Sequence, residues 1–393
     1  MSSELYYAIW DNEILKNWSK SRMKNITEVL PKSCFEAGEG NEEGKYPFYT
    51  SSQELSKRID TAIYNGNAIT MATGGNASVN YVDSKFSTST DCFNFKTNQH
   101  TKFIAYYLFA IKNEIINNLW FEGIGIRHLQ KNKLMQSHIY LPPISEQYRI
   151  AEYLDKKTES IDSIIKDLNK QVELLYDIKK SIINKAVING ITSGSSATKL
   201  KIGRVVDLKQ GLAINAQSSH LMTEEITSLP LLRIADMNTG TKEYFLKETT
   251  PKQYLAHEED IIYSRTGQVG LVFKNQFGVV HNNCFRVIPK DETIISRDFL
   301  YWVLKSDYFY NYANMLAFGS AQPDLSHHSF KSIVVSLFSI EEQKTIVSYL
   351  DKKCEEIDKI SADKIEQIKK LEDYKQSLIF EYVTGKKRVK EAM

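Results

Sequence analysis

The chain has 393 residues, of which 42% are hydrophobic and 25% are charged, and its formal net charge is +2. This length is too great for one ordinary hydrophobic core, so we expect at least two folded domains. The near-neutral charge by itself gives no indication of nucleic-acid binding. No apolar run approaches the roughly 18 residues that span a bilayer.

The N-terminal part of the chain predicts a short helix followed by a mixed globular unit. The first residues, MSSELYYAIWDNE, lack the basic and then apolar order of a secretory signal, so we expect a cytoplasmic protein. The helix-like stretch is ELYYAIWDNEILKNW, and the globular unit begins at Lys24. Its expected strands are NAITMATGGNASVNYV, broken at Gly74 and Gly75, then residues 86–95, and then SHIYLP. Residues 103–117 predict a buried helix.

Residues 144–190 predict one long amphipathic helix. The segment has no proline and no glycine before Gly190, and it is rich in Leu, Ile, Lys and Glu. Apolar residues recur every seven positions, with a second series four residues later, which is the pattern of a coiled coil. The first series is Leu154, Ile161, Leu168, Leu175 and Ile182, and the second is Ile165, Val172 and Ala186. At about 1.5 Å per residue, such a helix is on the order of 65 Å long.

A second globular unit follows a linker of small residues, INGITSGSSATK. It repeats the order of the first unit: PLLRIADM takes the place of YPFYTSS, and DIIYSRTGQVGLVF takes that of NAITMATGGNASVNYV. HNNCFRV and the helical stretch DFLYWVLKSDYFYN then match STDCFNF and the helix at Phe103. The alignment pairs Thr73 with Thr266, Gly74 with Gly267, Gly123 with Gly319 and Leu129 with Leu325.

The long helix is also repeated. Residues 340–383 match residues 144–187 without a gap at 21 of 44 positions, which identifies an internal repeat. The heptad series continues through Leu350, Ile357, Ile368, Leu371 and Leu378, and weakens at Ser361 and Lys364. Two matched helices in one chain predict a spacer in which they pack on each other. The alternative is that each amphipathic helix packs only on its own globular unit.

Signatures of catalysis and of metal binding are incomplete. FEGIG, at residues 121–125, fits the FxGxG pattern of adenosylmethionine-dependent adenine methyltransferases, but no acidic-Pro-Pro-aromatic tetrad accompanies it. Pro323-Asp324 begins no Glu-x-Lys nuclease cluster, and neither GxxxxGK[ST] nor GxSxG occurs. The scattered cysteines form no CxxC pair, and we expect Cys92 and Cys284 to be buried strand thiols. We therefore predict neither catalysis nor a metal site in this chain.

Four motifs occur in a fixed order along nearly the whole chain. Each long helix begins at an EQ motif, LPPISEQYRIAEYLD or SLFSIEEQKTIVSYLD, and ends in INKAVING or IFEYVTG. The second globular unit contains RTGQVG and then GSAQPDLS. Together these features resemble the specificity subunit of type I restriction-modification systems. The first globular unit departs from the pattern, with TGGNAS and IGIRHL at the corresponding places.

This resemblance implies a non-catalytic DNA-recognition subunit with an α+β fold. Two globular α/β target-recognition domains would each read half of a bipartite duplex in the major groove. Two long helices, packed as an antiparallel coiled coil, would set the spacing in a pseudo-twofold internal repeat. The implied domains are residues 1–143 and 203–339 for recognition, 144–190 and 340–393 for the helices with the C-terminal tail, and 191–202 for the linker.

The implied partners are double-stranded DNA and modification (methyltransferase) subunits, two in number, with restriction (helicase-nuclease) subunits in some systems. S-adenosylmethionine, ATP and magnesium would bind to these partners, and we expect no cofactor in this chain. A structural coiled-coil adaptor whose heads bind proteins is the alternative function.

Candidate DNA contacts lie at strand ends and in two loops of each globular unit. Arg and Gln side chains can pair bidentately with guanine or adenine edges. The candidates in the second unit are Arg233, Arg265, Gln268, Ser320, Gln322 and His327, and their counterparts by position in the first are Tyr49, Thr50, Ser52, Asn76, Arg127 and His128. For each polar residue the alternative is an ion pair or a loop hydrogen bond, and Tyr49 is more typical of a core aromatic residue.

Overall fold

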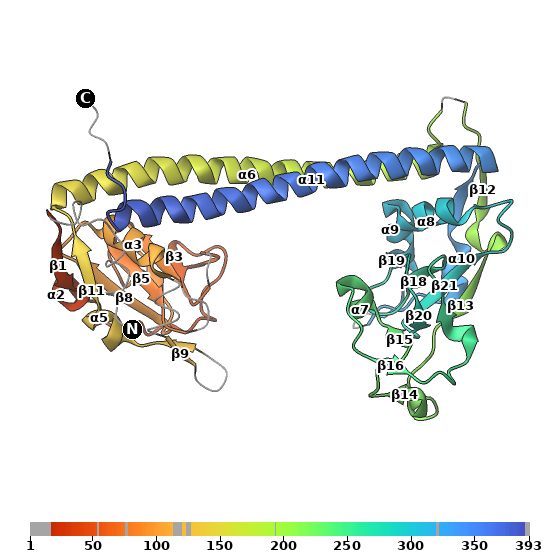
Figure 1. Ribbon diagram of the computed structural model, residues 1–393, viewed down its shortest axis with the longest axis horizontal. Coiled ribbons are helices and arrows are strands. Elements are labelled where there is room, and N and C mark those ends of the chain that lie inside the picture. Colours follow the sequence, from red (N-terminus) through yellow and green to blue (C-terminus); the bar gives the residue numbers. More distant parts are fainter. Residues whose placement is uncertain are drawn as a thin grey trace. The chain divides into compact units, whose positions relative to one another are not determined.

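The computed structural model describes residues 17–52, 55–74, 78–112, 120–122, 127–192, 194–319 and 322–389 (Figure 1). The chain forms two compact units, Met1–Asn169 with Glu366–Met393, and Lys170–Ile365. Each unit contains a globular head and parts of two long helices, α6 (Ile144–Asn189) and α11 (Ile340–Val383). The predicted N-terminal helix falls almost entirely on residues outside the described ranges.

The head of the first unit is built on an antiparallel sheet in the order β2-β8-β5-β6. These strands are β2 (Thr27–Val29), β8 (Cys92–Thr97), β5 (Ala68–Ala72) and β6 (Val79–Val82). A smaller sheet, β4-β3-β7, joins β4 (Lys57–Ile59), β3 (Tyr46–Tyr49) and β7 (Ser87–Thr88). Helix α3 (Thr101–Ala110) buries Phe103, Ile104 and Leu108 in one core with Ile69 and Phe95 of the larger sheet.

Shorter elements complete this head and lead into the long helix. Strand β1 (Ser19–Arg22) pairs antiparallel with β11 (His138–Leu141), and β9 (Trp120–Glu122) pairs with β10 (Arg127–Leu129). Helix α2 (Met23–Ile26) directly follows β1, and helix α5 (Lys131–Gln136) lies between β10 and β11. Pro142 and Pro143 then separate β11 from the start of α6, as expected for residues that interrupt a strand.

The second head contains a matching antiparallel sheet in the order β13-β21-β18-β19. Its strands are β13 (Val206–Gln210), β21 (Cys284–Pro289), β18 (Ile261–Ser264) and β19 (Val272–Phe273). The smaller sheet comprises β14 (Met222–Thr223), β16 (Phe245–Leu246), β15 (Leu229–Leu232), β20 (Gly278–Val280) and β17 (Leu255–Ala256).

Helices and a final strand pair complete the second head. The helices are α7 (Ile234–Thr239), α8 (Arg297–Lys305), α9 (Asp307–Leu316) and α10 (His327–Ser332), with short 3-10 turns at Ile202–Arg204, Ser219–Leu221 and Lys252–Tyr254. Strand β12 (Thr198–Lys201) pairs antiparallel with β22 (Val334–Leu337), as β1 pairs with β11 in the first head.

The two heads share the topology of their larger sheet, so the internal repeat extends beyond the long helices. Both larger sheets have equivalent strand order, and both smaller sheets contain one parallel pair, β3·β7 or β15·β20. Cys92 lies opposite Ala72, and Cys284 lies opposite Ser264. Both thiols are buried in strands, as predicted, and burial raises the pKa of each.

Two details of the sequence prediction are wrong. Because Ala72 faces Cys92 and Ser264 faces Cys284 in the strand register, Thr73 is equivalent to Arg265 and Gly74 is equivalent to Thr266. This is one residue away from the predicted alignment. The predicted alignment matched Thr-Gly with Thr-Gly by residue type. Backbone hydrogen bonds, which set the strand register, pair the two segments differently. The expected single strand at residues 86–95 is two strands, because a turn that bonds Cys92 N to Ser89 O separates them. The predicted helix at 103–117 corresponds to α3, and residues 113–119 lie outside the described ranges.

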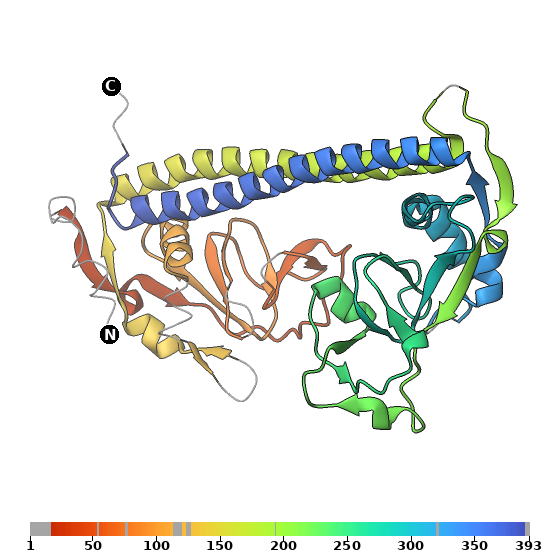
Figure 2. The same cartoon turned by 45° about the vertical axis from the view of Figure 1, so that its right-hand side comes forward.

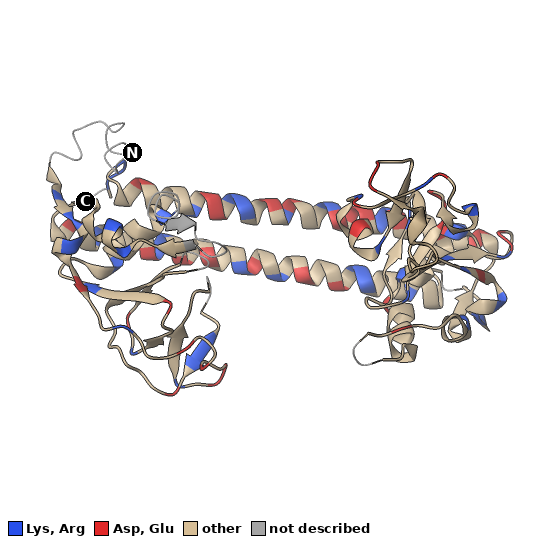
Figure 3. Ribbon diagram, turned by 90° about the horizontal axis from the view of Figure 1, so that it is seen from below, with Lys and Arg blue, Asp and Glu red and all other residues tan. Residues whose placement is uncertain are grey.

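Within each unit, α6 and α11 lie side by side and run antiparallel (Figures 1 and 2). Lys375 Nζ lies 2.6 Å from Asp162 Oδ1 in the first unit, and Lys179 Nζ lies 2.6 Å from Asp358 Oδ1 in the second. The two ion pairs use the same positions of the repeat, because both residues of each pair differ by 196 from those of the other. Basic and acidic residues alternate along both helices, so neither presents a continuous basic face (Figure 3).

The predicted heptad positions form the seam between the helices. Leu168, Val172 and Leu175 are half-buried, whereas their neighbours Ile164 and Leu174 are exposed. The seam is incompletely buried because a two-helix pair covers each seam residue from one side only. The predicted weak positions are also seen: Lys364 Nζ donates to Gln171 Oε1 at 2.5 Å across the seam, and Ser361 bonds to the carbonyl of Ile357.

Each long helix also packs on a head within each unit. In the first unit, Ile150 and Leu154 of α6 and Ile379 of α11 belong to the head's core. In the second, Leu350 of α11 and Val187 of α6 do so. The prediction that the helices pack on each other is therefore confirmed, and packing on the globular units occurs in addition.

Candidate nucleic-acid interface

A buried glutamine fixes each head to the start of a long helix. Gln147 Oε1 accepts from His100 N at 3.1 Å, and its Nε2 donates to Pro142 O at 2.9 Å. Gln343 Oε1 accepts from Ser296 N at 2.9 Å, and its Nε2 donates to Phe338 O at 2.9 Å. Both side chains are fully buried. The glutamine of the EQ motif is therefore a structural tie that orients each head.

An aspartate about two turns further on provides a second tie. Asp155 of α6 accepts from Tyr106 Oη at 2.8 Å and pairs with Lys102 Nζ at 2.7 Å. Asp351 of α11 accepts from Trp302 Nε1 at 2.9 Å. Tyr106 and Trp302 occupy equivalent positions on α3 and α8. Different donors therefore bond to equivalent aspartates in the two units. In each unit the head is held at two points on the helix, and its loops are positioned by a rigid element.

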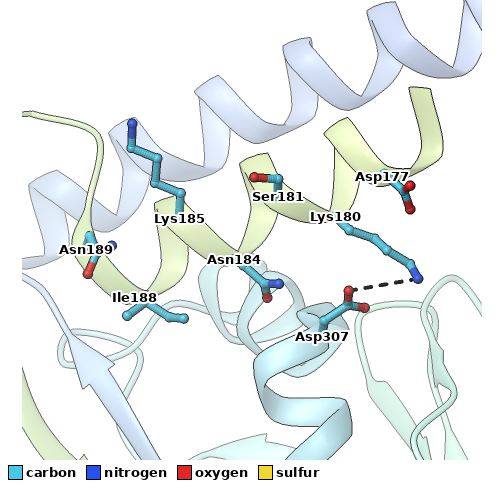
Figure 4. Close-up of a pocket in the computed structure, with 8 residues that line it drawn as sticks. All are labelled: Asp177, Lys180, Ser181, Asn184, Lys185, Ile188, Asn189 and Asp307. Carbon is cyan, nitrogen blue, oxygen red and sulfur yellow. Dashed lines mark ion pairs between the residues drawn. The ribbon is translucent and has the colours of Figure 1, made fainter. Parts of the chain in front are cut away.

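In the second unit a third contact positions α9 against the end of α6. Asn184 Oδ1 accepts from Tyr308 N at 3.0 Å, and Lys180 Nζ lies 3.9 Å from Asp307 Oδ2 (Figure 4). Lys180, Asn184 and Asp307 line an open polar cleft along the last turns of α6. None of the candidate DNA contacts that the structure describes lies there.

Two loops of the second head are joined at the edge of the larger sheet. They follow β18 and α9, and carry the RTGQVG and GSAQPDLS motifs. Leu325 N donates to Arg265 O at 2.9 Å, and Gly267 N donates to Pro323 O at 2.9 Å. Gly267 has a φ of +81°, a conformation that favours glycine, and any larger residue there would be strained. The loops that were predicted separately from sequence thus form one surface.

The centre of this surface is a polar cluster of five side chains. The guanidinium of Arg265 pairs with Asp324 at 2.5 Å and donates to Gln210 Oε1 at 3.1 Å. His327 Nε2 lies 2.8 Å from the same Gln210 oxygen, and Thr266 Oγ1 donates to Asp324 Oδ1 at 2.5 Å. Arg265 and His327, two of the candidates, are therefore brought together. Arg265 is bonded to Gln210 and Asp324, and His327 is bonded to Gln210 through Nε2.

The charges in this cluster shift the pKa of its titratable members. Partial burial acts to raise the pKa of Asp324, but hydrogen bonds from Thr266 and Arg265 outweigh burial and hold that pKa below its usual value. Burial, and next the positive charge of Arg265, lower the pKa of His327. Near pH 7 the cluster thus contains an ionised Asp324 and a neutral His327.

The other candidates of the second head have different surroundings. Gln268 and Gln322 are exposed in the two joined loops, and Ser320 lies outside the described residues. Arg233 is engaged elsewhere: it bonds both oxygens of Asp236 at 2.7 Å, contacts Glu243 at 2.7 Å and stacks 4.0 Å from the ring centre of Tyr244. These hydrogen bonds, led by Asp236, raise its pKa.

The first head has the same loop connection with different side chains. Leu129 N donates to Thr73 O at 2.8 Å, the counterpart of the bond from Leu325 to Arg265. Gly74 forms an isolated bridge with His128, as Thr266 does with Asp324. Asn76 lies outside the described residues, and Arg127 lies in β10. The connection is common to both heads, whereas the residues beside it are not.

The remaining candidates of the first head lie at the end of β3 and just after it. Tyr49 packs edge-on against Phe86, with ring centres 5.9 Å apart, and burial raises its pKa. Thr50 Oγ1 accepts from Ser52 N at 3.2 Å, and Ser52 is exposed. Tyr49 is thus placed as a packing residue, and Thr50 and Ser52 form a surface turn.

Sequence reasoning missed three members of the polar cluster, Gln210, Thr266 and Asp324. Gln210 is the last residue of β13 and lies 55 and 117 residues from its partners Arg265 and His327, so no short motif connects them. Asp324 was considered only as a nuclease carboxylate, whereas it neutralises Arg265. No local signal was available, because these contacts join segments far apart in the chain.

Other kinds of site are limited in the described part of the chain. Among the described residues, no three His, Cys, Asp or Glu side chains come close enough together to hold a metal ion. The described helices include none that is both long and apolar enough to cross a membrane.

Comparison with known proteins identifies the heads. The family model for the type I restriction modification DNA specificity domain matches residues 15–174 and again residues 196–370. Two relatives from Methanocaldococcus jannaschii are each 26% identical to this chain. The MjaVIII type I restriction enzyme specificity subunit aligns over 68% of this chain and 66% of its own length, and the putative MjaX specificity subunit over 74% and 69%.

Solved structures share the fold. A chain described under complex assembly and conformational transition of the type I R-M system has a TM-score of 0.70 at 16% identity, covering 94% of this chain and 98% of that one. The HsdS subunit of Thermoanaerobacter tengcongensis has a TM-score of 0.50 at 16% identity, covering 94% and 97%.

Two heads that share the topology of their larger sheet, each matching a DNA specificity domain and each fixed to paired long helices, define a non-catalytic DNA-recognition subunit. The chain belongs to the type I restriction-modification specificity family. Membership implies DNA binding and assembly with other subunits of such a system.

Proposed function

We propose that each head of this chain reads one half of a bipartite duplex target, and that the paired helices hold the two readers at a set spacing. The supporting observation is that both heads have the same loop connection with different side chains beside it. Thr73, Gly74 and His128 in the first head are replaced by Arg265, Thr266 and Asp324 in the second. Matched scaffolds with unlike side chains suit two readers of unlike base sequences.

The proposed base contacts of the second head lie on the two joined loops. Gln268 and Gln322 supply exposed amides, and Arg265 and His327 supply the polar cluster between them. Ser320 belongs to the same loop by sequence. Arg233, with its guanidinium bonded to two carboxylates, is proposed as a contact that must exchange one of them for DNA.

In the first head the corresponding proposed contacts lie near the matching connection and after β3. His128 and Arg127 of β10, with Asn76 by sequence, correspond to the joined loops of the second head. Tyr49 is the last residue of β3 in the parallel strand pair of the smaller sheet, and Thr50 and Ser52 follow it. Of these, the exposed Ser52 and His128 are the readiest to reach a base edge.

The modification subunits are proposed to dock on the exposed apolar positions of the long helices. Ile164 and Tyr374 are exposed in the first unit, and Ile178 and Ile360 in the second. Ile164 corresponds to Ile360, and Ile178 to Tyr374, at the repeat offset of 196 residues. Two equivalent surfaces suit two methyltransferase subunits, with restriction subunits joining in systems that cleave. Adenosylmethionine, ATP and magnesium are assigned to those partners, and the assembly to the cytoplasm.

The test is to map methylated adenines in DNA from cells that express this chain with its methyltransferase subunit. A split motif with a fixed unspecified gap is expected. Replacing residues 1–143 or residues 203–339 with the corresponding head of a relative should change one half of the motif and leave the other half and the gap unchanged. The wild-type chain in the same cells is the matched control.

Two results would contradict the proposal. An unchanged motif after both head exchanges would mean that the heads do not read the bases. If the chain supports no sequence-specific methylation and its heads instead bind proteins, it is the structural adaptor considered as the alternative.

A further inference from the structure

The amide of Gln210 has only one orientation that satisfies its neighbours. Its Nε2 lies 2.5 Å from the carbonyl oxygen of Asn282 and 3.4 Å from that of Cys284. Carbonyl oxygens only accept hydrogen bonds, so the NH₂ group must face them. Oε1 therefore faces the opposite side, where Arg265 Nη1 lies at 3.1 Å and His327 Nε2 at 2.8 Å.

This orientation determines the hydrogen position on His327. An amide oxygen cannot donate, so His327 Nε2 must carry a proton to bond to Gln210. In the neutral ring, Nδ1 is then an acceptor with a free lone pair. In the described part of the chain, Gln210 is the hydrogen-bond partner of the ring, through Nε2. The ring is further fixed by edge-on packing against Phe285, with ring centres 5.1 Å apart.

We propose that Gln210 is a positioning residue for base recognition by the second head. It holds Arg265 as a hydrogen-bond donor and His327 in the Nε2–H form, so that Nδ1 accepts from an exocyclic amino group of the DNA. In the major groove, adenine N6 and cytosine N4 are the amino donors, and guanine N7 and O6 are acceptors that suit Arg265. The cluster thus matches a step that combines a guanine with an adenine or a cytosine.

This inference rests on the proposed function of the second head, but the ring state has a readout that needs no DNA. The charged groups facing His327 are Arg265 and Asp324 on the joined loops and Lys331 one turn further along α10. The full-length chain is prepared with ¹⁵N-labelled histidine, and His327 is assigned by comparison with the His327→Gln variant. At pH 7, Nε2 is expected at the shift of a protonated nitrogen, and Nδ1 at that of an unprotonated one.

Two substitutions of Gln210 separate its roles. Gln210→Leu removes the acceptor and should allow both neutral forms of His327. Gln210→Glu places an oxygen where the NH₂ group faced two carbonyl oxygens, so the carboxylate should leave that position and pair with Arg265, and His327 should again populate both neutral forms. Gln268→Leu, an exposed change in the same region, should leave the His327 spectrum unchanged.

The DNA readout uses the full chain with its methyltransferase subunit and measures competition between the mapped target and single-base variants. Both Gln210 substitutions should reduce discrimination in the second head's half-site by roughly tenfold, the scale of one lost base contact, and leave the first half-site unaffected. Gln210→Glu retains a partner for Arg265. Its loss of discrimination should therefore be confined to the base pair whose amino group bonds to His327.

The outcomes are distinguishable. An Nδ1–H form of His327 in the wild type, or wild-type discrimination in both variants, overturns the positioning role. A wild-type chain with no sequence preference at all overturns the proposed function itself, whatever the His327 spectrum shows.

Discussion

Equivalent residues in the two heads have the same structural role but different side chains. The caps at the first turns of α3 and α8 are an example. His100 Nδ1 accepts from Phe103 N at 3.3 Å at the start of α3, and Ser296 Oγ accepts from Phe299 N at 3.3 Å at the start of α8. Both side chains cap a helix by accepting one of its unpaired N–H groups. A histidine can do so only when Nδ1 is unprotonated, so the first head carries a pH-sensitive cap.

The first prediction concerns this cap. Burial lowers the pKa of His100 below its ordinary 6.5, although Asp155 acts in the opposite direction. The unfolded chain therefore binds a proton at a pH where the folded chain does not. The stabilisation is complete above about pH 6.5 and is lost as the pH falls through the folded-state value.

We expect the free energy of unfolding, measured with urea, to decrease from pH 7.5 to pH 5.5 by less in His100→Ser than in the wild type. Serine is the residue at the equivalent position of the second head and caps without titrating. His220→Ser, at an exposed position, is the control and should leave the pH dependence unchanged. Equal slopes for His100→Ser and the wild type would show that this cap is not pH-sensitive.

The second prediction concerns the glutamine ties. Gln147→Leu leaves the N–H of His100 and the carbonyl of Pro142 without their partner in a fully buried place. We expect a loss of about 3 kcal/mol in the free energy of unfolding, because unpaired buried polar groups cost about 1–3 kcal/mol each. Gln343→Leu should cost a similar amount. Gln367→Ala, on the exposed face of α11, should change stability by less than about 0.5 kcal/mol. A loss below about 1 kcal/mol in both buried variants would be inconsistent with their role as ties.

At the level of the element, the long helices were the most predictable part of the chain, since their order comes from local periodicity. Leu168, Val172 and Leu175 occupy the seam as the heptad pattern indicates. The heads were less predictable, because strand register depends on hydrogen bonds between distant residues. The one-residue error at Thr73 and the missing Gln210 have this same origin: each depends on a contact that no local pattern records. The candidate loops were found because their glycines and polar residues are local signals.

The third prediction tests the weak point of the seam. Lys364 occupies a heptad position and donates to Gln171 across it. A polar residue at such a position lowers stability while helping to fix the alignment of the helices. We expect Lys364→Leu to raise the free energy of unfolding by about 1 kcal/mol, the scale of burying part of an apolar side chain. Lys166→Leu, on an exposed face of α6, should give no such gain. A destabilised Lys364→Leu variant would show that the lysine contributes more through its hydrogen bond than it costs.

At the level of the whole molecule, the repeat explains why a near-neutral chain serves in DNA recognition. The ion pairs Asp162–Lys375 and Lys179–Asp358 use their charges within the helix pair, and Arg265 and Arg233 are balanced by carboxylates within the second head. Little net charge is left for the phosphate backbone, which supplies most of the affinity in proteins that bind DNA alone. This composition suits a subunit that selects the sequence while its partners add phosphate contacts.

The last prediction tests whether the helices set the spacing. Three heptads inserted in α6 between Lys170 and Gln171, and three in α11 between Ile365 and Glu366, preserve the seam. They lengthen the helix pair by about 31 Å at 1.5 Å per residue. If the helices lie along the duplex, the gap in the methylated motif should grow by about nine base pairs. That is nearly one duplex turn, so the readers still face the same side of the DNA.

A single heptad in each helix adds about 10 Å and moves the second half-site roughly a third of a turn around the duplex, so methylation should fall sharply. Mapping methylated adenines for both variants decides the matter, because an unchanged gap after the three-heptad insertion would mean that the helices do not measure the target.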